Sequence, residues 1–338
     1  MQLGLGNLEH LVPERVRRSV WFRPRYPLVA LELREDAVVA ARLGRRHGTY
    51  HLLGHGHRSL PEGVFSTSMM RSKVGSSQEL GEAISEALTR AGAEGASRVS
   101  VALPDTVARA FVVDFQDLPS APREVENLIR WRLKKSVPFP LEQARLSWVQ
   151  LGRGDDSRAQ LLVALAPDEG LSVIENLVRA IGLRVGLIDL SSFSTFNALR
   201  VDGQLDDSRR GDTAVLSATP SYYSLIILRR GKLIFYRARS YHVQGAYQGE
   251  ESLRVVAREL RSSLSYYEEH LLGEGLARTL VRVVGIQAPG ILQVARDAGC
   301  GEVVMASMQR AVAELQAAPD EDVPDLLPVV GLALRREP

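Results

Sequence analysis

The chain has 338 residues, of which 45% are hydrophobic and 24% are charged, so it is long enough for two domains and too apolar to be disordered. Its 42 Lys and Arg residues nearly balance 40 Asp and Glu residues, and a net charge of +2 argues against nucleic acid as the main partner. A single cysteine, Cys300, excludes an internal disulfide and suits a reducing compartment. The sequence shows neither a run of the ~20 apolar residues that a membrane-spanning helix needs nor a secretion signal, so we expect a cytoplasmic protein.

Residues 1–25 have the pattern of a basic amphipathic helix. The apolar side chains can share one helical face, the arginines lie elsewhere, and Trp21 and Phe22 end the segment. These apolar positions are Leu8, Leu11, Val12, Val16 and Val20. Such a helix can lie on an anionic membrane surface, or it can dock on its own domain or on a partner. Both interpretations stay open.

From residue 26 the chain has the pattern of β-strands. The runs LVALEL, AVVAARLG and GTYHLLGHGH are short and separated by turn residues, which predicts an antiparallel meander. A helix is predicted next over residues 78–91, because its leucine and isoleucine residues recur at helical spacing, and a buried strand follows over residues 98–104.

Prolines frame a helix within residues 118–148. The helix begins after Pro122, with apolar side chains at i, i+3, i+4 and i+8 spacing, and it ends before Pro138, which cannot continue a helix. The apolar positions are Val125, Leu128, Ile129 and Leu133. After the motif VPFP, an extended segment leads to Trp148.

The second half of the chain repeats the order of strands followed by helices. A hairpin is indicated where Arg230, Gly231 and Lys232 separate two apolar runs. Strands are expected at residues 159–167, 213–221 and 281–286, helices at 171–183 and 251–271, and a strand followed by a helix over 185–199. Two similar halves of this kind indicate an internal duplication.

Several of these runs, in this order, resemble the type IV pilus assembly protein PilM family, which is actin-like and related to FtsA. They are the LP motif, amphipathic helix and VPFP motif of residues 118–140, the GL and ID motifs around the strand at 185–190, the helix motif ELRSSLSYYE and the terminal run VVGLALR. The resemblance covers about residues 26–336. It implies an α/β, actin-like (ribonuclease H-like, duplicated) two-lobed fold with a small inserted subdomain. Lobe I would comprise residues 26–196 with the insertion at about 108–166, lobe II residues 197–324, and residues 325–338 would return to lobe I.

The resemblance places a nucleotide site between the lobes, and the sequence departs from the family pattern at all three of its loops. The family reads about D-I-G-S-S-S-V-K in its first strand and turn, whereas this chain reads ELREDAVV over residues 32–39. The second phosphate loop is SATPS over residues 217–221, and the glycine run on the adenosine side is shortened to residues 285–290. The degenerate positions are Glu32, Arg34, Val39, Ser217, Gly285 and Gly290. Without backbone donors and charge neutralisation we expect a pseudo-ATPase with no catalytic residue and no cofactor. The alternative is a surviving site for ATP and Mg²⁺.

Function would then reside in surfaces. The resemblance implies a scaffold at the cytoplasmic face of the inner membrane, bound to the short cytosolic tail of a PilN-like bitopic membrane protein. Other pilus platform or motor components and self-association are further expectations. The wall of the tail-binding groove is predicted at Leu133, Val137, Pro138, Phe139 and Trp148, because apolar and aromatic anchors dominate such peptide sites. The alternative for these side chains is packing within the core of the subdomain.

Rival functions remain open from the sequence. They are a divergent actin-like ATPase that uses ATP to move its lobes, an FtsA-like filament protein, and an L-type protein of type II secretion. Four histidines, His47, His51, His55 and His57, suggest a metal site on one strand face, but no cysteine or carboxylate lies among them. We therefore expect a solvated hairpin and no metal there. Cys300, between two glycines, is expected to have no catalytic role.

Overall fold

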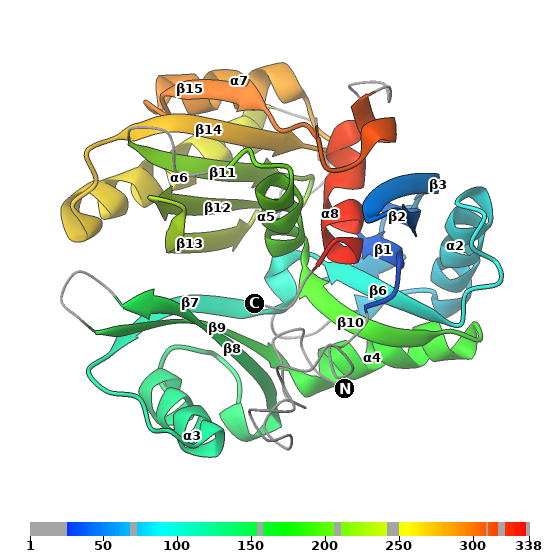
Figure 1. The fold of residues 1–338 in the computed structure, drawn as a ribbon, viewed down its shortest axis with the longest axis horizontal. Coiled ribbons are helices and arrows are strands. Elements are labelled where there is room, and N and C mark those ends of the chain that lie inside the picture. The colour runs from blue at the N-terminus through cyan, green and yellow to red at the C-terminus, as the bar shows by residue number, and fades with distance from the viewer. Residues whose placement is uncertain are drawn as a thin grey trace.

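A computed structural model describes residues 26–67, 73–153, 158–205, 211–241, 250–308, 310–316 and 322–335. The predicted N-terminal helix therefore lies outside the described residues. Two five-stranded sheets of the same topology lie on either side of a central pair of helices, and a smaller three-stranded unit lies beside them (Figure 1). Within the described part of the chain, none of the helices combines the length and apolarity required to cross a bilayer.

The first sheet has the strand order β10-β6-β1-β2-β3. Its strands are β1 (Val29–Leu33), β2 (Ala37–Arg46), β3 (Thr49–Ser59), β6 (Arg98–Leu103) and β10 (Arg184–Leu190). The first three are antiparallel, as expected for the predicted meander. Strand β6 pairs in parallel with β1, and β10 pairs in parallel with β6. Alternate residues of β1 face opposite sides: Leu31 and Leu33 pack with the helices α2 (Ser77–Arg90) and α4 (Asp168–Ala180), whereas Ala30 faces the centre of the molecule.

The second sheet has the order β13-β12-β11-β14-β15, which repeats the first. Its strands are β11 (Asp212–Ala218), β12 (Tyr222–Arg229), β13 (Lys232–Ser240), β14 (Leu276–Val283) and β15 (Glu302–Met305). Its outer face is covered by α6 (Glu250–Leu271) and α7 (Ala288–Asp297). The predicted hairpin joins β12 to β13, and φ is positive at both Arg230 (50°) and Gly231 (70°), as a tight type I′ turn requires.

A small subdomain occupies the part of the chain, about residues 108–166, for which the sequence predicts an insertion. It consists of the antiparallel strands β7 (Arg109–Phe115), β8 (Ala144–Arg153) and β9 (Ala159–Pro167), in the order β7-β9-β8, and α3 (Pro122–Leu133). Pro122 is in the first turn of α3, where its missing N–H is tolerated. Val125, Ile129 and Leu133 face the sheet, as their helical spacing predicts.

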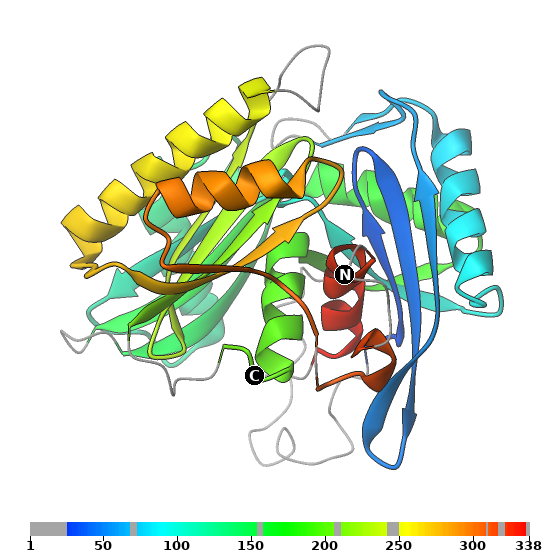
Figure 2. The same cartoon turned by 90° about the horizontal axis from the view of Figure 1, so that it is seen from above.

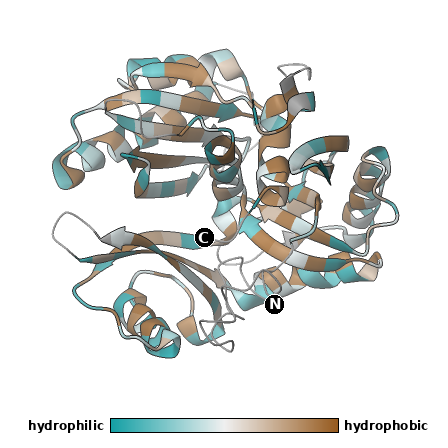
Figure 3. Ribbon diagram, in the orientation of Figure 1, coloured by the Kyte–Doolittle hydropathy of each residue, from teal (hydrophilic) through white to brown (hydrophobic). Residues whose placement is uncertain are grey.

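Two helices fill the space between the large sheets (Figure 2). They are α5 (Ser191–Val201) and α8 (Val323–Ala333), which pack against each other. Helix α8 also packs against β1, β2 and β6, and α5 packs against β6 and β10. Every residue of α8 except Asp325 is buried, and the most hydrophobic residues lie on α8 and the central strands (Figure 3). The predicted lobe boundary between residues 196 and 197 falls inside α5. The remaining elements are β4 (Phe65–Ser66), β5 (Lys73–Val74) and the 3₁₀ turns Asp105–Val107, Leu141–Gln143 and Ala313–Gln316.

Candidate functional site

Three loops meet between the lobes, at the position where the resemblance places a nucleotide. They are the β1–β2 turn, the β11–β12 turn and the β14–α7 loop. Gly285, at φ 67°, shows how close they are: a Cβ atom there would lie 2.6 Å from Cγ of Pro220 and 2.8 Å from Oδ2 of Asp36. The protein's own atoms therefore fill the junction of the three loops.

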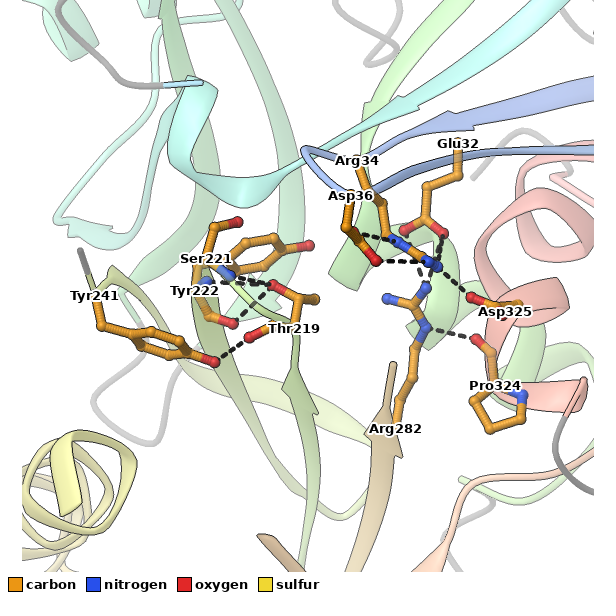
Figure 4. A network of polar contacts seen from close by, with 10 residues as sticks. All are labelled: Glu32, Arg34, Asp36, Thr219, Ser221, Tyr222, Tyr241, Arg282, Pro324 and Asp325. Carbon is orange, nitrogen blue, oxygen red and sulfur yellow. Dashed lines mark hydrogen bonds and ion pairs between the residues drawn. The ribbon is translucent and has the colours of Figure 1, made fainter. Parts of the chain in front are cut away.

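A buried ion pair joins the two large sheets at this junction (Figure 4). Arg282 of β14 donates from one terminal nitrogen to both carboxylate oxygens of Glu32 in β1, at 3.0 and 2.8 Å. Its Nε donates to the carbonyl oxygen of Pro324, at the start of α8, at 2.7 Å. Both charged side chains are 0% exposed. Because the surroundings exclude water, this pair depends strongly on its geometry.

A second arginine extends the pair into a network of five charges. Arg34, in the β1–β2 turn, donates to both oxygens of Asp36 at 3.0 and 3.1 Å and to the carboxylate of Asp325 in α8. It also lies 3.6 Å from Glu32. Burial alone would lower the pKa of Arg34, but the three carboxylates outweigh it and raise that pKa. Burial alone would raise the pKa of Asp325, but the positive charge of Arg34 outweighs burial, so that pKa is lowered.

The second phosphate loop uses its backbone donors internally. Thr219 Oγ1 accepts from the N–H of Tyr222 at 3.2 Å and from the N–H of Ser221 at 3.4 Å. The hydroxyl of Tyr241 donates to the Thr219 carbonyl. Phosphate loops work by directing such N–H groups at the ligand, so this turn has fewer donors to offer.

The charge balance of this network is unfavourable for a nucleotide. Three carboxylates and two guanidinium groups leave one net negative charge, which would repel a triphosphate. Each of these three carboxylates is already paired with an arginine. Across the described residues, no three His, Cys, Asp or Glu side chains are gathered as a metal site.

A second buried contact between the lobes centres on Asp105, in the 3₁₀ turn after β6. It accepts from the backbone N–H of Ser192 at 3.2 Å, from the Ser192 hydroxyl and from the hydroxyl of Tyr236 in β13 at 2.6 Å. The ring of Tyr236 also stacks on Phe193, with centroids 4.8 Å apart. Burial raises the pKa of Asp105, and the hydrogen bonds partly oppose that rise.

Only some of the predicted nucleotide positions come together. Glu32, Arg34 and Gly285 belong to the junction, and Ser217 lies beside Arg282 in the register of β11 and β14. Val39 is instead a core residue on the β2 face turned toward α8, and Gly290 packs against Leu253 where α7 approaches α6.

Two members of the charge network, Arg282 and Asp325, are not among the site residues predicted from the sequence. The one local signal was an arginine within the apolar strand VRVVGI. A charged side chain at such a position needs a buried partner, but nothing in the sequence names it.

Four of the five predicted groove residues belong to the core of the subdomain or pack against it. Leu133 is buried, whereas Val137, Phe139 and Trp148 are partly buried and pack against that core. Pro138 is exposed, and with Phe139 it lines a hollow beside the Leu141–Gln143 turn. This placement matches the alternative in which Phe139 and Trp148 pack within the subdomain.

A different, largely apolar groove of about 320 Å³ lies between the subdomain, β10, α5 and the β12–β13 hairpin. None of the five predicted residues lines it. Strand β8 explains the difference, because alternate side chains point to opposite faces: Trp148 faces α3, whereas Val149 and Leu151 face the groove. Other apolar lining residues are Leu162, Ile188, Leu190, Phe193, Phe196 and Leu233. Its polar lining includes Asn197, which donates to the Gly331 carbonyl, and Arg335, which pairs with Asp189.

Two other potentially reactive side chains, Cys300 and His51, lie in buried or hydrogen-bonded positions. Cys300 is buried, and burial raises the pKa of its thiol to about 11, so almost none of it is the reactive thiolate near neutral pH. His51 lies 2.8 Å from Glu314, which also accepts from the N–H of Leu52 at 3.2 Å. These contacts tie β3 to the segment before α8.

Comparisons with known proteins identify several similar solved structures. A solved structure described as a PilM-PilN type IV pilus biogenesis complex is 19% identical, covers 92% of this chain and 97% of its own, and has a TM-score of 0.73. A Bacteroides thetaiotaomicron protein with an actin-like ATPase fold is 8% identical over 87% of this chain and 94% of its own, with a TM-score of 0.49. The cytoplasmic domain of EpsL, an inner membrane component of type II secretion in Vibrio cholerae, is 13% identical over 77% and 84%, with a TM-score of 0.46. No curated protein sequence matches significantly.

The first of these structures shows that the chain has the predicted actin-like α/β fold. The family model "Type IV pilus assembly protein PilM" matches residues 31–251, more than half of the chain. The chain therefore belongs to the type IV pilus assembly protein PilM family.

Proposed function

We propose that this protein is a scaffold of the type IV pilus assembly platform that binds the cytosolic tail of a PilN-like membrane protein and does not hydrolyse ATP. The observation that carries the proposal is the apolar groove lined by Val149, Leu151 and Phe193. A concave, largely apolar site with a few polar groups in its lining is typical of a site for a ligand such as a peptide segment. A similar fold occurs in a structure described as a PilM-PilN complex, which supports a partner of that kind.

The closed junction between the lobes supports the pseudo-ATPase part of the proposal. A nucleotide would have to displace the pairing of Arg34 and Arg282 with their carboxylates and reopen the Thr219 turn. If no nucleotide binds between them, the two lobes act by presenting surfaces that bind partner proteins. A membrane-anchored partner would hold the protein at the cytoplasmic face of the inner membrane.

Replacing Val149 with Asp is expected to weaken binding of the partner's tail at least ~30-fold, because a carboxylate placed in the apolar lining loses its hydration when the tail binds. The measurement is fluorescence anisotropy with labelled tail peptides from the bitopic membrane proteins encoded beside this chain. Pro138→Ala and Phe139→Ala are matched controls, since they alter the originally predicted surface and leave the groove unchanged. Loss of binding in the controls but not in Val149→Asp would move the site to the predicted residues. Failure of every tail to bind the folded wild-type protein would reject the proposed partner.

Millimolar Mg-ATP is expected to leave the thermal unfolding midpoint unchanged, because the charge network leaves a triphosphate no site. A ligand at ~100 times its dissociation constant adds ~2.7 kcal/mol of stability, so a functional site would give a clear shift. A tail peptide that binds the groove is the positive control in the same assay. A shift with Mg-ATP that disappears in Arg282→Ala would favour the rival function, a divergent actin-like ATPase.

A further inference from the structure

A second hollow, of about 350 Å³, lies between the subdomain and the second sheet, and the proposed function does not use it. Its walls are consecutive residues of two strands: residues 108–111 at the start of β7 and residues 235–239 of β13, with Tyr266 of α6 at one side. The hollow is thus a trough along two strands. In the described residues β7 and β13 each end their sheet, so each presents an unpaired backbone edge.

Arginines dominate this trough. Arg109, Arg237 and Arg239 line it, and Glu259 of α6 lies near two of them. Glu259 is 3.6 Å from Arg237 and 4.0 Å from Arg239. It is also shared with Arg258, at 3.5 Å. One carboxylate is therefore shared by three guanidinium groups.

Two of the arginines have unused hydrogen-bonding capacity. Among the described residues neither a hydrogen bond nor an ion pair involves the side chain of Arg109. Its pKa is lowered by burial and by repulsion from Arg239, which means that an added anion would stabilise it. The Nε of Arg237 is buried without a hydrogen-bond partner, although buried donors are normally satisfied.

Shape and charge select the ligand. An extended chain fits a trough bounded by strand edges, because it can use their free backbone groups while its side chains reach the walls. Guanidinium groups bind carboxylates through two parallel hydrogen bonds. The aromatic rings of Phe111 and Tyr266 offer apolar contact between the charges.

We propose that the trough between β7 and β13 binds an extended acidic segment of a partner protein, held by Arg109, Arg237 and Arg239. This site lies beside the apolar groove and shares Ala108 with it, but their other lining residues differ, so a platform component other than the tail can occupy it at the same time. Each arginine that pairs with a ligand carboxylate strengthens binding, and salt weakens it.

The test uses a labelled hexapeptide in which glutamate alternates with glycine, and the same peptide with glutamine in place of glutamate. We expect the acidic peptide alone to bind, with a tenfold or greater loss in Arg109→Ala and in Arg239→Ala. Arg254→Ala is the matched control, because Arg254 lies on α6 as an exposed arginine paired with Glu250, outside the trough. Equal binding of the two peptides, or equal loss in the control, would overturn the proposal.

One variant should bind more tightly. Glu259→Gln removes the carboxylate that shares the arginines while it keeps the side chain's size, so we expect severalfold tighter binding of the acidic peptide. Inorganic phosphate is the competing probe: if it displaces the peptide at equal molar concentration, the site is one for small anions and not for a peptide. Tail binding to Val149→Asp is measured in parallel, so that loss of groove binding and loss of trough binding are distinguished.

Discussion

Replacing Glu32 with Leu is expected to lower the free energy of unfolding by about 3–5 kcal/mol, since it leaves the charge of Arg282 buried without a carboxylate in ion-pair contact. The Pro324 carbonyl, 2.7 Å from Arg282 Nε, remains but carries only a partial charge. The loss is measured by urea unfolding, from the midpoint and the slope of the transition. An exposed pair gives the scale for comparison: Arg254→Ala, opposite Glu250, should change stability by less than ~1 kcal/mol.

The double variant Glu32→Leu/Arg282→Met separates two explanations of that loss. A buried ion pair replaced as a whole by apolar side chains of similar size is often neutral or stabilising, whereas removal of one partner is not. We therefore expect the double variant to recover most of the stability lost in Glu32→Leu. A double variant as unstable as the single one would mean that Glu32 acts through its packing or through Arg34, 3.6 Å away, and not through Arg282.

The network also connects stability with the proposed loss of the nucleotide site. In the family pattern the loops at this junction present small residues and backbone donors, whereas here side chains from β1, β14 and α8 meet. The same contacts that we propose exclude a triphosphate join the two sheets and α8. They would make the junction rigid, which suits the proposed role of presenting fixed surfaces to partners.

Local patterns were enough to predict most of the secondary structure. Short apolar runs separated by turn residues predicted β1 to β3, helical spacing predicted α2 and α3, and the Arg230-Gly231 turn predicted the β12–β13 hairpin. Helix α7 was missed because its first turn contains Gly290 and Pro289, and the stretch was interpreted as the remnant of a glycine loop. Proline in the first helical turn is in fact favourable, since its missing N–H has no partner there.

The long-range contacts of the site could not be predicted in this way. Arg34 and Asp325 are 291 positions apart, and Arg282 and Glu32 are 250 apart, so no periodicity connects them. The residues that line the groove could not be predicted for a different reason. Strand β8 is apolar on both faces, and only the position of α3 decides that Trp148 packs inside the subdomain while Val149 is left for a ligand.

Gly331, where α8 crosses α5, is the site of the second large expected effect. Replacing it with Ala should lower the free energy of unfolding by at least ~2 kcal/mol, because a Cβ atom there would lie 1.9 Å from the carbonyl oxygen of Ser194 and 2.9 Å from the N of Ala198. Both obstacles are backbone atoms of α5, so no side chain can move aside. Helix propensity alone predicts the opposite sign, a gain of ~1 kcal/mol for Ala over Gly.

Gly81 provides the matched control, as a helical glycine whose added Cβ would meet only a side-chain methyl of Ile181, at 3.3 Å. Gly81→Ala should therefore change the free energy of unfolding by less than ~1 kcal/mol. A stabilised Gly331→Ala would show that α5 and α8 can separate without loss of stability.

The crossing of α5 and α8 also borders the groove, where Gly331 and Phe193 are both lining residues. If Gly331→Ala stays folded, the displaced α5 should reshape the groove and weaken tail binding, whereas Gly81→Ala should leave it unchanged. The spacing of two buried helices would then determine both the stability of the fold and the shape of the surface offered to the partner.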